Sequence, residues 1–314
     1  MTGRRRHSRP LAAVFIILVI LAIGVWIFFP RPKNPYGRKT YILVSDPIVI
    51  ASWSEADRVL TLISFPSDIA AEGTHGYGTY SLAAFWRLGE IDKKDGTVLV
   101  ESVSEALGIP VTGYIGPKTG EFSFGDEALV SAKSIFSLKH VFGVIGGRYR
   151  TNIPLKQFID LAWLLNFSRP DRVNTYDFTN NTARVAQDSV LPDGSIVRIL
   201  DPQRVDNQLK TVFEDESVRR ESVTVAVYNT TTMPSLGNRI GRLLANIGVS
   251  VVTIGNDTPE TDACIVAGSE QTLKSKSAQV IVAVLGCNRV VGDTSRADLI
   301  IRIGKTYAKR FVPN

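Results

Sequence analysis

The chain has 314 residues and a formal net charge of +6, but the positive charge is concentrated at one end. Residues 1–40 hold eight of the 36 Lys and Arg and no Asp or Glu, so residues 41–314 carry 28 cations against 30 carboxylates, a net charge of −2. Nucleic-acid binding requires a basic face on the folded domain. This charge distribution therefore argues against a nucleic-acid partner.

An uninterrupted apolar run, LAAVFIILVILAIGVWIFF, occupies residues 11–29. As an α-helix it would be roughly 28 Å long, close to the roughly 30 Å hydrocarbon core of a bilayer. The alternative is a cleaved secretory signal, because four arginines precede the run. The apolar region of a signal is about 7–15 residues long and ends in small side chains, whereas this run ends in Trp26, Phe28 and Phe29. We therefore expect a transmembrane helix at residues 11–29.

The charges that flank this run predict its orientation. Four cations lie on each side of it, and the dense cluster before the run favours a cytoplasmic tail at residues 1–10. The large remainder of the chain would then lie outside the cytoplasm. Residues 30–39 contain three prolines and four cations, as is typical of an extended, solvated linker at the membrane surface.

The next 160 or so residues, 40–200, show alternating β-like and helical patterns. Residues 40–51 and 58–65 are rich in Val, Ile and Leu and predict neighbouring buried strands. Helices are predicted at residues 96–107, which Gly108 terminates, and at residues 154–167. Two short strands are expected within residues 175–200. This order predicts an α/β domain.

A polar, charged stretch at residues 201–220 predicts a linker to a second, smaller α/β domain at residues 221–310. That domain opens with a strand at residues 222–229, in which valines alternate with period two. A helix closed by Gly248 and a strand at residues 249–254 follow.

The two cysteines, Cys264 and Cys287, both lie in this second domain. Outside the cytoplasm they could form a disulfide, which would constrain the unfolded chain by roughly 3 kcal/mol. The alternative is a pair of buried thiols that pack as small hydrophobic side chains.

Two parts of the sequence resemble known bacterial families. The pattern VTVAVYNTTTMPSLGNRIGRLLANIGVSVVTIG, followed by ADLIIRIGKTYAKRF, resembles the LytR C-terminal domain over residues 222–308. The first domain resembles a divergent LytR-CpsA-Psr (LCP) catalytic domain. That membrane-anchored family transfers glycopolymers from polyprenyl-pyrophosphate carriers to peptidoglycan. The resemblance implies a single-pass protein of the bacterial plasma membrane with extracytoplasmic domains.

The LCP resemblance rests mainly on two aspartates that follow strands. Asp46 corresponds to the aspartate of the family's Arg-Ser-Asp-Thr segment, and Asp68 to that of its Ile-Pro-Arg-Asp segment. Val44 and Ser67 stand where the family has the arginines. Guanidinium groups are well suited to binding pyrophosphate, so their absence would remove the main phosphate contacts. Leu-Gly-Ile-Pro at residues 107–110 also matches the family.

The resemblance implies that Asp46 and Asp68 are the catalytic residues and that both bind Mg²⁺. The alternative is that both aspartates only end strands and cap turns. Other arginines are candidates for contacting the substrate: Arg58, Arg87, Arg148 and Arg150.

Two functions follow from these observations. The first is transfer of a glycopolymer from a polyprenyl-pyrophosphate carrier, with peptidoglycan as acceptor. The second is a non-catalytic envelope protein that keeps the fold and binds glycan, lipid or protein. The three histidines are too scattered to form a zinc site.

Overall fold

The computed structural model describes residues 24, 35–118, 122–123, 132–134, 136, 143–144, 146–167, 169–191, 194–209, 211–292 and 294–312. Residues Asn34–Asn314 form one compact unit, separate from Met1–Lys33. Apart from Gly24, the span predicted at residues 11–29 lies outside the described residues. Among the helices that are described, none has the length and apolarity needed to cross a membrane.

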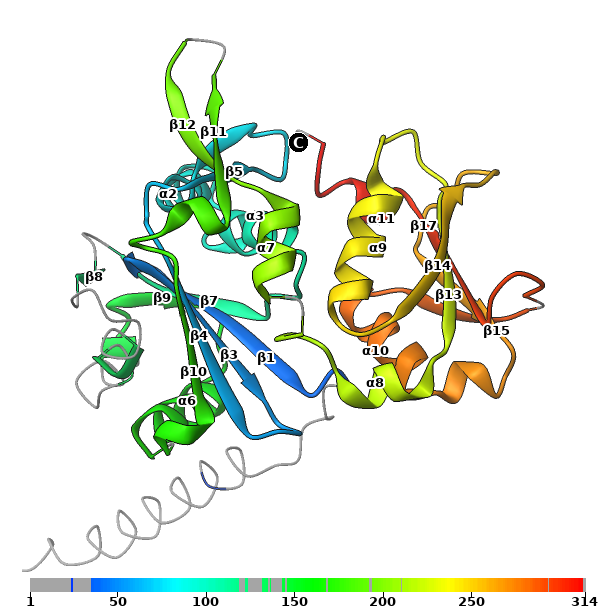
Figure 1. Cartoon of the computed structure of the whole chain (residues 1–314), viewed down its shortest axis with the longest axis horizontal. Helices are drawn as coiled ribbons and strands as arrows, with labels where there is room; N and C mark the ends of the chain where they lie inside the picture. The colour runs from blue at the N-terminus through cyan, green and yellow to red at the C-terminus, as the bar shows by residue number, and fades with distance from the viewer. Residues whose placement is uncertain are drawn as a thin grey trace, which may run out of the picture. The chain divides into compact units, whose positions relative to one another are not determined.

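The first domain is built around a six-stranded mixed sheet (Figure 1). Its strands, in spatial order, are β10 (Val173–Asp177), β4 (Val59–Phe65), β3 (Ile48–Ser54), β1 (Arg38–Leu43), β7 (Gly113–Pro117) and β9 (Tyr149–Thr151). β1 is antiparallel to β3 and parallel to β7.

Both faces of this sheet are buried, which explains why its strands are continuously apolar. Ile42, Ile50 and Ile63 face a core that includes residues of α2 (Leu82–Ile91), α3 (Thr97–Leu107) and α7 (Pro202–Leu209). Leu43 and Leu62 face a second core, which α6 (Leu155–Phe167) covers. Figure 1 shows α6 on one side of the sheet and α3 and α7 on the other. The predicted α/β architecture is confirmed.

The prediction of one strand over residues 40–51 is wrong. The chain turns within this run, and β1 and β3 pair as an antiparallel hairpin in which Leu43 lies opposite Val49. Pro47 lies in the turn, where its missing N–H leaves no strand hydrogen bond unmade. Ser45 and Asp46 form a two-residue strand, β2, which pairs with β8 (Phe122–Ser123). The turn places Asp46 at the end of the sheet.

The two strands predicted within residues 175–200 correspond to β11 (Ala186–Val190) and β12 (Ile196–Leu200). They form a hairpin in a smaller sheet with β5 (Ala70–Glu72) and β6 (Thr79–Ser81). Short 3-10 helices precede it at Pro170–Arg172 and Thr182–Arg184.

Residues 201–220, predicted to be a linker, contain α7 and α8 (Glu216–Glu221). Val205 and Leu209 of α7 are buried in the core of the first domain. The other faces of these short helices carry polar side chains, so the stretch looks polar in the sequence although it has a buried apolar face. Val218 of α8 is instead buried in the core of the C-terminal domain. The stretch is therefore folded, with α7 packed on the first domain and α8 on the C-terminal domain.

The C-terminal domain is a small α/β domain, as predicted, and it is built on a five-stranded sheet. The strand order is β14 (Ser250–Asn256), β13 (Thr224–Asn229), β17 (Leu299–Ile303), β15 (Ile265–Gly268) and β16 (Asn288–Val291). Its helices are α9 (Leu236–Asn246), α10 (Lys276–Leu285), α11 (Lys305–Ala308) and the 3-10 helix Thr272–Lys274. Gly241 lets α9 lie close to β14, since a Cβ there would be 2.5 Å from Ile254 Cδ1.

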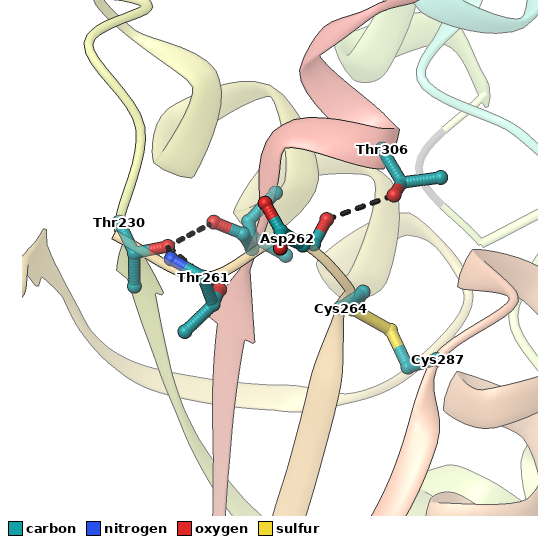
Figure 2. The surroundings of a disulfide bond; sticks show 7 residues. Thr230, Thr261, Asp262, Cys264, Cys287 and Thr306 are labelled. Atoms are coloured by element: carbon teal, nitrogen blue, oxygen red, sulfur yellow. Dashed lines mark hydrogen bonds between the residues drawn. A yellow bond between two sulfur atoms is a disulfide. The ribbon is translucent and has the colours of Figure 1, made fainter. Parts of the chain in front are cut away.

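A disulfide joins Cys264 and Cys287 in this domain (Figure 2). The two cysteines immediately precede the parallel strands β15 and β16. The loop before β15 is held by further polar contacts: Thr230 Oγ1 lies 2.8 Å from Thr261 Oγ1, and Thr306 Oγ1 donates to the carbonyl of Asp262 over 2.8 Å. The disulfide and these hydrogen bonds hold the same end of the sheet.

Arg242 of α9 connects the C-terminal domain to the first domain. It forms a two-pronged ion pair with Asp206 of α7, at 2.7 and 2.8 Å. It also donates to the carbonyls of Glu105 and Ala106, in the last turn of α3. A carbonyl at a helix end lacks a partner within the helix, so Arg242 caps α3 from another domain.

Glu221 fixes the start of α10 through three hydrogen bonds. Its carboxylate accepts from the N–H of Lys276, the N–H of Ser277 and the hydroxyl of Ser277, at 2.6–2.8 Å. Burial by itself would raise the pKa of Glu221, but the hydrogen bonds from Ser277 and Lys276 lower it below 4.5. A carboxylate at a helix N-terminus also interacts favourably with the helix dipole.

We expect Glu221→Gln to destabilise the protein by about 1 kcal/mol at neutral pH. Because folding lowers the pKa, this stabilisation is complete above the unfolded-state pKa and is lost as the pH falls through the folded-state value. Urea unfolding at about pH 7 and about pH 2.5 should therefore show a difference that disappears in acid. Glu216→Gln, which removes an exposed ion pair with Arg220, is the control and should have a smaller effect. An equal difference at both pH values would contradict the assignment.

Candidate functional site

A cavity of about 510 Å³ lies at the end of the main sheet where β3 and β4 meet the loops around Asp46 and Ser67. It is lined by side chains from β2, β3, α2 and the end of β7. The lining residues are Val44, Ser45, Asp46, Ile48, Ser67, Ala83, Trp86, Arg87, Glu90, Pro117 and Lys118.

The apolar wall of the cavity is held in place by aromatic packing. Trp86 of α2 lies edge-on to Tyr114 of β7, with ring centroids 5.5 Å apart. Residue 116 is glycine because a Cβ there would lie 2.6 Å from Cζ2 of Trp86. Burial raises the pKa of the Tyr114 hydroxyl above its ordinary value.

The charged side chains of the cavity are of both signs. Arg87 and Lys118 are exposed cations, and Asp46 is an exposed carboxylate. Glu90 lies one helical turn after Arg87, so both side chains lie on the same face of α2. Its Oε1 is buried and lies 3.5 Å from Nε of Arg150. The cavity thus combines two cations and two carboxylates beside an apolar wall.

The structure brings the two predicted aspartates to one end of the sheet. Ile48 pairs with Phe65, and Asp46 and Asp68 lie just beyond these two residues on their respective strands. Asp46 lines the cavity, whereas Ser67 and not Asp68 lines it from the second loop. Asp68 is exposed beside the cavity.

The four predicted arginines are not brought together. Arg87 lines the cavity. Arg58 lies in the turn at the opposite end of the β3–β4 hairpin, roughly 20 Å away along the strands. Arg150 donates to Asp95 over 2.6 Å and reaches the cavity only through Glu90. Arg148 is exposed, and its carbonyl accepts from the N–H of Lys118.

Sequence analysis missed three residues of the site: Trp86, Glu90 and Lys118. No helix was predicted at α2; with that helix assigned, Glu90 lies three residues after Arg87 and four after Trp86, a spacing that places it beside both. Lys118 follows β7, which is paired in parallel with β1. The carboxyl ends of parallel neighbours meet at one edge of a sheet, but that pairing is not visible in the sequence.

The carboxylates that line the cavity decide whether it is suited to bind the predicted Mg²⁺. Among the described residues, no group of three or more His, Cys, Asp and Glu is placed to hold a metal ion. Mg²⁺ sites that serve phosphate ligands commonly use only one or two carboxylates, together with water and phosphate oxygens. Asp46 and Glu90 line one cavity and fit that pattern when a phosphate completes it.

Comparison with protein families identifies the C-terminal domain. Residues 222–307 match the LytR_C family, described as "LytR cell envelope-related transcriptional attenuator". The resemblance expected for this part of the chain is confirmed. A comparison with curated proteins found no match.

The chain is also similar in fold to solved structures at low sequence identity, among them one described as a LytR-CPS2A-psr family protein. One is TagV of Bacillus subtilis, with 11% identity and a TM-score of 0.37, covering 56% of this chain and 95% of that one. Another is B. subtilis YwtF (TagT) with bound octaprenyl pyrophosphate lipid, with 14% identity, a TM-score of 0.36, and 58% and 91% coverage. Lin1025 of Listeria innocua has 13% identity, a TM-score of 0.38, and 56% and 95% coverage.

Proposed function

We propose that the chain is a membrane-anchored, extracytoplasmic protein of the bacterial cell envelope, and that its first domain binds a polyprenyl-pyrophosphate-linked glycan in the 510 Å³ cavity. The observation that carries this proposal is the pairing of two exposed cations, Arg87 and Lys118, with the apolar wall around Trp86. A pyrophosphate needs cationic donors, and a prenyl chain needs apolar surface.

Binding without transfer is the function that the site supports best. Val44 and Ser67 both line the cavity, and they are the positions where the LCP resemblance expects arginines. Arginine at these positions would stabilise charge that develops on the transferred phosphate. With valine and serine there, the cavity retains cations for binding but lacks two of the groups that the transfer reaction would use.

Glycopolymer transfer to peptidoglycan is the second candidate, and the acidic residues of the cavity favour it. Asp46 and Glu90, with Asp68 beside them, would be the ligands of Mg²⁺ in a phosphate complex. The ion would neutralise phosphate charge. Arg87 and Lys118 would position the pyrophosphate while the acceptor hydroxyl approaches it.

Binding and transfer can be tested on the full chain in lipid nanodiscs. We expect a polyprenyl pyrophosphate to bind at least about tenfold more tightly than the monophosphate with the same prenyl chain, because the second phosphate engages another cation. Equal affinity for the two lipids would contradict the proposed site.

The second measurement adds Mg²⁺, a polyprenyl-pyrophosphate glycan and a peptidoglycan acceptor. We expect binding of the donor with no product. Glycan attached to peptidoglycan would instead establish the transferase. Restoring the two arginines, with Val44→Arg and Ser67→Arg, provides a matched gain-of-function variant for the same assay.

A further inference from the structure

Helix α6 carries two apolar stripes, and only one of them is used in the core. Phe158, Leu161 and Leu165 are buried against the main sheet. Ile159, Trp163 and Phe167 recur at intervals of four residues and form a second stripe, which we call the outer stripe. Their exposed fractions are 40%, 67% and 67%.

The two aromatic side chains of the outer stripe form one continuous surface. The rings of Trp163 and Phe167 pack against each other, with centroids 4.2 Å apart and ring planes tilted by 32°. Exposing an apolar surface of this kind to water is energetically unfavourable, and such a surface commonly marks an interaction site. Tryptophan in particular favours the interface between lipid headgroups and acyl chains. The chemistry of the outer stripe thus fits a bilayer surface.

The course of the chain places a bilayer within reach of this stripe. Trp163 and Lys39 line one cavity of about 380 Å³, together with Trp53 and Arg58. Lys39 follows the predicted span by only nine residues. Nine extended residues reach at most roughly 30 Å. A domain tied so closely to a membrane can place a nearby apolar surface against it.

Cations around the stripe are suitably placed to meet lipid phosphates. Arg58 lies in the cavity beside Trp163, and Arg169 and Arg172 follow directly after α6. All three side chains are exposed. Exposed carboxylates also lie nearby, including Asp160 and Asp171, so net charge contributes little and apolar insertion is the main attraction.

We propose that Trp163 and Phe167 insert into the outer interface of the phospholipid bilayer and fix the orientation of the first domain on the membrane. This inference rests on the membrane anchor of the proposed function, but not on the ligand of the 510 Å³ cavity. The occupant of the outer stripe is the lipid interface itself.

The test uses the full chain in phosphatidylcholine vesicles with a single fluorescent label. Both native cysteines are in a disulfide, so a label can be attached selectively at Asn166→Cys on the exposed side of α6. Lipids carrying nitroxide at the headgroup or at a shallow acyl position serve as quenchers. We expect strong quenching at residue 166 and little at Asp188→Cys, on the β11–β12 hairpin.

Replacement of the aromatic pair by Trp163→Ala and Phe167→Ala should reduce quenching at residue 166 to the level of the control site. The matched control, Val190→Ala with Ile196→Ala, removes two side chains that are 68% and 73% exposed and should leave that quenching unchanged. The chain should still float with the vesicles in every variant.

Four outcomes would overturn the proposal. A label at residue 166 that is not quenched, in vesicles that float together with the protein, would show that the lipid contact is absent although the anchor is present. Quenching that survives the loss of both aromatic side chains would show that the outer stripe does not make the lipid contact. Crosslinking between residue 166 of two copies, in place of quenching, would show that a second copy covers the stripe. A chain that does not float with the vesicles would show that the membrane anchor is absent as well. None of these results depends on whether the cavity binds pyrophosphate.

Discussion

Arg87→Glu is expected to weaken binding of a polyprenyl pyrophosphate by about 100-fold. A hydrogen bond to a charged group contributes roughly 1.5–3 kcal/mol, and a carboxylate in its place adds repulsion. A loss of about 3 kcal/mol corresponds to that factor. Affinity is measured on the full chain in nanodiscs, with the prenyl alcohol as a ligand that lacks phosphate and should bind the variant and the parent protein equally.

Two further variants make this prediction sharper. Lys118→Glu changes the second cation of the cavity and should weaken pyrophosphate binding to a similar extent. Arg289→Glu places the same charge change on β16 of the C-terminal domain, at an exposed position away from the cavity. It should leave affinity within a factor of about two. If Arg289→Glu weakens binding as much as Arg87→Glu, net charge rather than the cavity governs binding.

The second large effect is expected from Arg242→Ala, which should destabilise the protein by about 3 kcal/mol. The side chain of Arg242 is 20% exposed, and its removal leaves Asp206 without its ion-pair partner. It also removes the hydrogen bonds that Arg242 donates to the carbonyls of Glu105 and Ala106 at the end of α3. Thermal and urea unfolding measure this loss.

A double-mutant cycle with Asp206→Ala separates the ion pair from the helix cap. Truncating both partners should cost less than the sum of the single losses, because each single variant leaves a charge unpaired. Arg219→Ala is the matched control, since its contact with Glu214 is 3.6 Å long and exposed, and it should cost less than about 1 kcal/mol. A loss below about 1 kcal/mol for Arg242→Ala would contradict the role assigned to this arginine.

The elements that could be predicted from the sequence are those whose boundaries depend on residues close together in the chain. The helix ended by Gly108 was predictable because that glycine adopts the left-handed conformation that closes α3. The strand β13 was likewise predictable from its alternating valines, which lie in one core, although Ala226 and Tyr228 on its other face are buried as well. These signals depend only on neighbours in the chain.

Features that depend on pairing between distant segments could not be predicted in this way. The cavity contains Lys118 rather than Arg58 because β1 pairs with β7 and because the β3–β4 hairpin directs Arg58 to the other end. The positions of both side chains depend on which strands pair and in which register. The predicted linker at residues 201–220 is folded because Val205 finds its apolar partners elsewhere in the chain.

The disulfide of the C-terminal domain also determines how that domain responds to proteolysis. Cys264 and Cys287 are 23 residues apart and enclose a 3-10 helix and α10. A protease that cuts once within this loop, for example after the exposed Lys274, leaves both fragments covalently joined. β15 and β16 would then stay adjacent after cleavage, and reduction would be needed before either fragment could separate.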